Sequence, residues 1–287
     1  MSGGDHRYRA PDYDTLVDSP IVVGNPAVYD FDVDGKKHSL VDVGEGGVFD
    51  GARAARDLEA VVKEDRRLWG SLPYDKYLFL NMITEAGGGL EHKNSTLLMT
   101  NRWTTRTRKA YLSWLELCSH EYFHAWNVKR LRPAEFASFD YTRENYTELL
   151  WFFEGFTSYY DDLFLLRAGL IDGARYVKLV GRAMNGVRQS PGQHVQSVAE
   201  ASFDAWIKYY RADENTPNST ISYYTKGSLV ALRLDLALRA GGKATLDDVM
   251  RALWREAPGG AVTEELILKT VARLGGKAAA AELREWV

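Results

Sequence analysis

The stretch "CSHEYFHAWNVKRLRP", residues 118–133, carries two histidines four positions apart, with a glutamate directly after the first. Helical spacing places His120 and His124 on one face, with their Cβ atoms about 5–6 Å apart. Two imidazoles so placed can hold one metal ion. Glu121 lies about 100° further round the helix, where it can reach a water beside that ion. This pattern is typical of a zinc site in which the glutamate serves as general base.

The alternative is an ordinary core helix that happens to carry two histidines. The surrounding residues are largely apolar, which predicts a buried helix: Tyr111, Trp114, Leu115, Leu117, Cys118, Phe123 and Trp126. Two buried histidines without partners would be costly. The cost of burying two unpartnered histidines therefore favours a metal site over a core helix.

A catalytic zinc ion needs a third protein ligand and an open fourth position. The apolar segment "ELLWFFEGFTSYYDDLF", residues 148–164, has Glu154 in its middle. A glutamate among so many aromatic side chains should be paired or metal-bound. Glu148 and Asp161 are the alternatives. Glu148 suits a helix start. Asp161, on nearly the same face as Glu154, suits either a supporting hydrogen bond to a ligand or a solvated surface.

Composition excludes several classes of function. The chain has 287 residues, a net charge of −3 and one cysteine. The small charge gives no reason to expect nucleic acid or an anionic membrane as a partner. A single cysteine excludes an internal disulfide and a cysteine-rich zinc finger. No apolar run approaches the length of a membrane span, and the first residues lack the apolar core of a signal peptide. Localisation stays unassigned.

The order of predicted elements indicates an α+β fold. Residues 20–105 read mostly as strands and turns, including a hairpin at Asp34-Gly35 and a buried strand "KYLFLNMI". The helix between them begins near Asp50, a candidate N-cap. Later residues read as helices over 107–130, 145–168, 172–189, 222–240, 245–256, 263–273 and 277–286.

The stretches "HEYFHAWNVKRLRP" and "WFFEGFTSYY" resemble the glycyl aminopeptidase family of zinc metallopeptidases. These are gluzincins, distantly similar to the aminopeptidase N family and to thermolysin. The resemblance begins near residue 10 and implies a thermolysin-like catalytic domain, with a mixed-sheet N-terminal lobe and a mainly helical C-terminal lobe. It also implies one zinc ion per chain, bound by His120, His124 and Glu154, with Glu121 as the base.

Two further stretches gain a role from this resemblance. "GGGLEH", residues 87–92, matches a substrate-binding glycine-rich strand in which Glu91 would hold the free α-amine and Gly88 and Gly89 would allow close backbone approach. A plain surface turn is the alternative, and His92 stands where the aminopeptidase N family has asparagine.

"YYTKG", residues 223–227, matches the helix start whose tyrosine donates a hydrogen bond to the oxyanion. Tyr224 fits the spacing, and Tyr223 is its closest competitor. The alternative is a tyrosine of the core.

The implied function is release of N-terminal residues, glycine or alanine by the family's name, from peptides with a free N-terminus. A zinc endopeptidase and a catalytically silent peptide-binding module remain as alternatives.

Family members have a β domain before the catalytic domain and a PDZ domain after it. We expect residues 1–20 to be a remnant of that β domain or a linker. Residues 21–130 would form the sheet lobe that ends in the zinc-binding helix, and residues 131–287 the helical lobe that carries the third ligand. We expect no PDZ domain in this chain, although the full-length protein can contain both missing domains.

Overall fold

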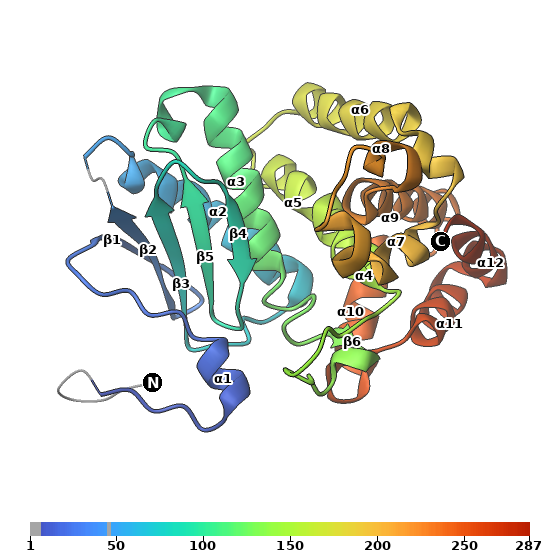
Figure 1. Cartoon of the computed structure of the whole chain (residues 1–287), viewed down its shortest axis with the longest axis horizontal. Coiled ribbons are helices and arrows are strands. Elements are labelled where there is room, and N and C mark those ends of the chain that lie inside the picture. Colours follow the sequence, from blue (N-terminus) through green and yellow to red (C-terminus); the bar gives the residue numbers. More distant parts are fainter. Residues whose placement is uncertain (1–6, 45–46) are drawn as a thin grey trace. The chain divides into compact units, whose positions relative to one another are not determined.

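The computed structural model describes residues 7–44 and 47–287 (Figure 1). Residues 1–6 of the predicted 1–20 segment lie outside the described residues, and the helix α1 (Tyr13–Val17) falls within its remainder. The contacts divide the chain into two compact units. The sheet unit runs up to Glu59 and over Leu72–Ala125, and the helical unit comprises Ala60–Ser71 and Trp126–Val287. Each unit is described by itself.

The sheet unit contains a five-stranded mixed sheet in the order β1-β2-β3-β5-β4. Its strands are β1 (Ala27–Val33), β2 (Lys36–Gly44), β3 (Lys76–Ile83), β4 (Gly88–Glu91) and β5 (Ser95–Thr100). β2, β3 and β5 run parallel, whereas β1 and β4 are antiparallel edge strands. The predicted hairpin at Asp34-Gly35 is confirmed, and both residues have positive φ, 53° and 71°, as a tight two-residue hairpin turn requires.

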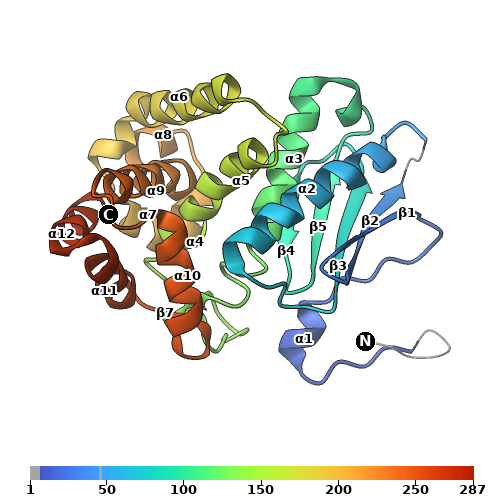
Figure 2. The same ribbon diagram turned by 180° about the vertical axis from the view of Figure 1, so that it is seen from behind.

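Two helices accompany the sheet. Figure 2 shows α2 (Gly51–Trp69) crossing one face of the strands, with α3 (Arg108–Phe123) beside it. Asp50 accepts a hydrogen bond from the Arg53 N–H at 3.1 Å, which confirms it as the cap of α2. α3 contacts β4 and β5, so the edge strand β4 lies next to the helix that carries "HEYFH".

The first hydrogen-bond chain that holds α3 passes through Asn81. Its amide donates to Asp42 Oδ1 at 2.7 Å, and its carbonyl oxygen accepts from Trp114 Nε1 at 3.2 Å. Burial raises the pKa of Asp42 to about 6. Since both bonds are buried, breaking either would leave a desolvated polar group. They therefore fix Trp114 of α3 to the central strands.

The second chain begins at His38, which is fully buried. Its Nδ1–H donates to the Lys36 carbonyl at 2.9 Å, which leaves Nε2 to accept from the Tyr74 hydroxyl at 2.9 Å. The Tyr74 hydroxyl is also hydrogen-bonded to that of Tyr122 on α3. Burial lowers the pKa of His38 to about 4, so the ring is neutral at pH 7.

The helical unit is built around α9 (Tyr223–Ala240), which contacts α4, α5, α6, α7, α10 and α12. These and the remaining elements are α4 (Leu150–Phe153), α5 (Gly155–Arg167), α6 (Gly173–Gln189), α7 (Val198–Phe203), α8 (Thr216–Ser219), α10 (Leu246–Glu256), α11 (Glu264–Gly275), α12 (Lys277–Trp286), and the paired strands β6 (Arg132–Pro133) and β7 (Ala261–Val262). In the described part of the chain, no helix combines the length and apolar character needed to cross a membrane. Together with the mixed sheet, these helices confirm the predicted α+β class.

Two predicted helices were wrong in extent. The helix expected over 107–130 ends at Phe123. Val128 has a φ of 131°, a conformation that no right-handed helix contains and that a β-branched residue rarely adopts. The helix expected over 145–168 begins at Leu150 and is interrupted at Glu154, between α4 and α5.

We predict that His38 makes the sheet unit acid-sensitive. The unfolded histidine has a pKa near 6.5 and the folded one about 4, so the unfolded state binds more protons below pH 6.5. The contribution of the neutral His38 ring to stability should be complete above pH 6.5 and be lost as the pH drops toward 4, by on the order of 2–3 kcal/mol. The raised pKa of Asp42 acts in the opposite direction in this range, so the difference between wild type and variant isolates the histidine. Urea unfolding of wild type and His38→Gln at pH 7.5, 5.5 and 4.5 measures this. A difference between the two proteins that does not change with pH would contradict it.

Candidate active site

The two histidines lie together at the C-terminal end of α3. His124 is the C-cap residue, and its N–H donates to the His120 carbonyl at 3.3 Å. The ring centroids are 4.7 Å apart and nearly perpendicular. His124 is buried and His120 half-buried. Both rings therefore occupy one face of the helix, as the spacing predicts, and one side of His120 stays accessible.

Strand β4 brings a second carboxylate to this helix end. Glu91, Glu121 and His124 each offer one ligand atom, and these atoms lie within 4.8 Å of one another. Glu121 is buried and Glu91 half-buried. Two carboxylates this close repel each other unless a proton or a cation lies between them. The arrangement therefore suits a metal ion or an ammonium group, and it adds Glu91, Glu121 and His124 as an alternative donor set.

The glycines of β4 make this approach possible. A Cβ on Gly89 would overlap the carboxyl and Cγ of Glu121, so any larger residue there would have to displace that side chain. Gly88 has a φ of 127°, in the region that side-chain-bearing residues avoid. The alternative of a plain surface turn is wrong, because Gly88–Glu91 form the edge strand of the sheet.

In the helical unit, Glu154 lies at the break between α4 and α5. Its N–H donates to the Leu150 carbonyl at 2.7 Å, and its own carbonyl accepts from the Ser158 N–H at 2.8 Å. The side chain is half-buried. Among its two competitors, Glu148 is exposed, whereas Asp161 is buried and so is no solvated surface residue.

Two glycines allow α5 and α9 to cross almost in contact. A Cβ on Gly155 would lie 2.5 Å from the Cα of Gly227, and a Cβ on Gly227 would lie 2.6 Å from the Trp151 carbonyl oxygen. Gly155 follows Glu154 directly, and Gly227 lies three residues after Tyr224. The crossing thus brings the starts of these two helices, and the residues at them, together.

Tyr224 belongs to a cluster of four tyrosines around this crossing. Its ring contacts those of Tyr223 and Tyr209 at 4.7 and 5.7 Å, and its hydroxyl lies 3.1 Å from that of Tyr210. Burial and the Glu154 charge raise the pKa of Tyr224 well above 10, so its phenol is a proton donor at neutral pH. Tyr223 is almost fully buried, as a core tyrosine is.

Sequence reasoning missed Tyr209 and Tyr210. The only signal is their place in the aromatic run "WIKYY", residues 206–210, which lies outside every motif quoted above. The glycine pair was also missed, although both glycines stand inside quoted motifs.

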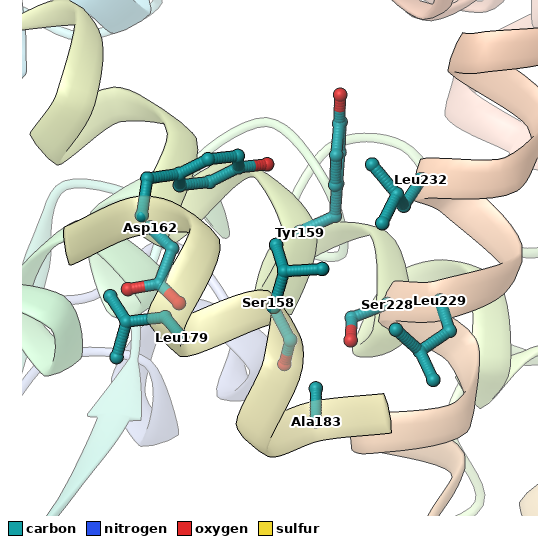
Figure 3. Close-up of a pocket in the computed structure, with 10 residues that line it drawn as sticks. Ser158, Tyr159, Asp162, Leu179, Ala183, Ser228, Leu229 and Leu232 are labelled. Atoms are coloured by element: carbon teal, nitrogen blue, oxygen red, sulfur yellow. The ribbon is translucent and has the colours of Figure 1, made fainter. Parts of the chain in front are cut away.

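A cavity between α5, α6 and α9 lies one helical turn beyond the crossing. Figure 3 shows its lining, with Ser158 and Asp162 of α5, Leu179 and Ala183 of α6, and Ser228 of α9. Its volume is about 30 Å³, which holds a water molecule and no amino-acid side chain. We therefore do not assign it to substrate.

The predicted site residues belong to both units. His120, Glu121, His124, Gly89 and Glu91 come together in the sheet unit. Glu154 and Tyr224 come together in the helical unit.

Comparison with known proteins supports the predicted resemblance. Residues 113–230 match the M61 glycyl aminopeptidase family, a range that includes "HEYFH", Glu154 and Tyr224 but excludes Glu91. A solved structure of an aminopeptidase N family protein from Idiomarina loihiensis is 39% identical to this chain, with a TM-score of 0.95. The match covers 100% of this chain and 51% of that protein, so this chain spans about half of that relative.

More distant structures share the fold. The M1 zinc metallopeptidase from Deinococcus radiodurans is 17% identical with a TM-score of 0.58, over 92% of this chain and 51% of that one. Native yeast LTA4 hydrolase is 14% identical with a TM-score of 0.63, over 91% and 39%. One structure of a mutant of the Deinococcus protein contains a Tyr-Ser-Ala substrate. A search of curated proteins finds no match.

We predict that Gly89→Ala disables the Glu121 carboxyl while leaving the protein folded. The new methyl group would displace that carboxyl, because the strand and the helix are both fixed by their neighbours. Gly87→Ala is the matched control, since a Cβ there meets no described atom within 4 Å. Peptide hydrolysis should fall at least about 100-fold in Gly89→Ala, the scale of a lost acid–base catalyst, and remain near wild type in Gly87→Ala. Equal activity of the two variants would contradict this prediction.

Proposed function

We propose that this chain, which matches the M61 glycyl aminopeptidase family over residues 113–230, is the catalytic region of a zinc-dependent aminopeptidase that removes small N-terminal residues from peptides. The observation that carries the proposal is the end of α3, where two adjacent imidazoles and a buried glutamate stand on one helix. The preference for glycine or alanine rests on the family resemblance.

The metal would be held by His120, His124 and Glu154. Two imidazole nitrogens and one carboxylate oxygen are a donor set that zinc accepts, with a fourth position left for water or substrate. The adjacent imidazoles of α3 fit this requirement. When bound, zinc supplies a Lewis acid and lowers the pKa of a bound water to about 7.

The protein's own residues would move the protons. Glu121 is placed to take the proton of the attacking water and pass it to the leaving amine. Burial and the Glu154 charge keep Tyr224 protonated, so its phenol can donate a hydrogen bond to the oxyanion as charge develops there.

Glu91 would make the enzyme an aminopeptidase. Its carboxylate stands at the edge strand, near Glu121 and His124, where it can pair with the ammonium of the first residue of a peptide. Because this ion pair requires a free N-terminus, cleavage at internal peptide bonds would be disfavoured. Without such a role for Glu91, the same chemistry would make an endopeptidase, which cuts blocked and free peptides alike.

We predict that Glu121→Gln retains zinc and loses most of its turnover, by about 10²–10⁴-fold, because a general base acts on water and not on the ion. His120→Ala should lose the metal. Glu116→Gln, on the same helix, is the matched control. Mass spectrometry of the native protein gives zinc per chain, expected to be about one, and hydrolysis of a glycyl chromogenic substrate gives turnover. Loss of zinc from Glu121→Gln would instead favour the Glu91, Glu121 and His124 donor set.

We also predict that Glu91→Gln raises KM for free-amine peptides by about 10–100-fold, the range of a lost hydrogen bond to a charged group. The amide keeps the shape of the side chain and removes its charge. A peptide and its N-acetylated twin, compared by steady-state kinetics, measure the preference for a free amine, which should shrink in the variant. Wild-type values for both peptides would remove the aminopeptidase assignment and leave a zinc hydrolase.

A further inference from the structure

The segment before α9 contains an unusual helical turn, and the residue that follows it contacts Tyr224. Residues Ala205–Tyr209 form a single π-helical turn, η4. The Tyr210 N–H donates to the Ala205 carbonyl, five residues back, at 3.0 Å. Single π-helical turns are rare and occur frequently at functional sites. The presence of this turn therefore favours a functional role for the residues at its end.

Hydrogen bonds tie the residues before this turn to α4 and to the segment that leads into α9. The Trp151 N–H, three residues before Glu154, donates to Ser202 Oγ at 2.9 Å. The buried Gln196 side chain donates to Asp204 at 2.9 Å and accepts from the Ile221 N–H at 3.2 Å. The start of η4 is thus held at fixed positions relative to α4 and to the start of α9.

Tyr210 reaches Tyr224 from this turn. The two hydroxyl oxygens are 3.1 Å apart. The Tyr210 ring contacts Trp206 at 5.5 Å and Tyr209 at 5.3 Å, and 57% of the residue is exposed. Tyr209 also contacts the Tyr224 ring, but its hydroxyl interacts with Ser222. The Tyr223 hydroxyl is hydrogen-bonded to those of both Tyr210 and Tyr224. Of these partners of Tyr224, Tyr210 is the exposed one, whereas Tyr223 is buried.

A phenol has one proton to donate and lone pairs to accept with. If Tyr224 gives its proton to an oxyanion, its oxygen can accept a second hydrogen bond. A donor on that oxygen orients the hydroxyl toward the substrate, and hydrogen bonds in such a chain strengthen one another. Tyr210, with its exposed ring, can in turn accept from solvent.

We propose that Tyr210 is a positioning residue, whose hydroxyl donates to that of Tyr224 and holds it in the orientation that stabilises the oxyanion. The proposal rests on the proposed function, in which Tyr224 is the oxyanion donor. Tyr210 would support the oxyanion donor from the end of η4, whereas Tyr224 itself lies on α9.

The test is a double-mutant cycle in the zinc-loaded chain, with a glycyl chromogenic substrate. Tyr210→Phe should lower kcat by about 3–10-fold, the effect of one neutral hydrogen bond, with KM unchanged. Tyr224→Phe should lower kcat by about 10²–10³-fold. In the Tyr224→Phe background, Tyr210→Phe should have no further effect, because it acts through Tyr224. Tyr209→Phe is the matched control and should keep wild-type kinetics.

A readout besides turnover comes from inhibitor affinity. A phosphinic pseudodipeptide carries a tetrahedral oxyanion, so its inhibition constant should rise in Tyr210→Phe by the same factor as kcat falls. The affinity for free glycine, a product, should not change. Zinc content and thermal midpoint of each variant establish that it is folded and loaded.

Three outcomes would overturn the proposal. Equal effects of Tyr210→Phe in both backgrounds would mean that it does not act through Tyr224. A silent Tyr210→Phe beside an impaired Tyr224→Phe would remove the proposal and leave the proposed function intact. A silent Tyr224→Phe would remove both the oxyanion assignment and the role of Tyr210.

Discussion

Buried hydrogen bonds that tie α3 to the sheet help to set the position of the candidate groups on this helix. Apolar packing holds a helix against a sheet but is non-directional, so it leaves rotation about the helix axis weakly determined. The Asn81 chain fixes Trp114, and the His38 chain fixes Tyr122, which lies directly after Glu121. Since an unmade buried hydrogen bond costs its full desolvation, these two anchors permit one rotation. That rotation turns both imidazoles to one side and the Glu121 carboxyl toward β4.

Glycine has opposite uses in the two units. On β4, Gly89 has no side chain, and the Glu121 carboxyl of α3 occupies the space where a Cβ would lie. The helix side chain can therefore pack directly against the strand backbone. In the helical unit, Gly155 and Gly227 let two helix backbones touch, and a larger residue at either position would push the helices apart. Both arrangements give up the stability that a packed side chain would add. In return, each brings polar side chains from separate elements to one place.

Sequence patterns predicted the parts of this structure that depend on local rules. The hairpin at Asp34-Gly35, the cap at Asp50 and the helical spacing of the two histidines all follow from residues within a few positions. The patterns failed where distant contacts decide. Nothing local predicts that α3 ends at Phe123 or that Val128 takes a positive φ, and the apolar run around Glu154 reads as one unbroken helix. Tyr210 was missed because its partner, fourteen residues away, is reached only through a π-helical turn.

The break at Glu154 links these features. Glu154 is both the C-cap of α4 and the N-cap of α5, and its backbone keeps the helical hydrogen bonds to Leu150 and Ser158. Its carboxylate is half-buried. That charge then contributes to the raised pKa values of Tyr209, Tyr223 and Tyr224, after burial in each case. Under the proposed function, Glu154 would be the anionic metal ligand, and the neutral phenol of Tyr224 beside it would donate to the oxyanion.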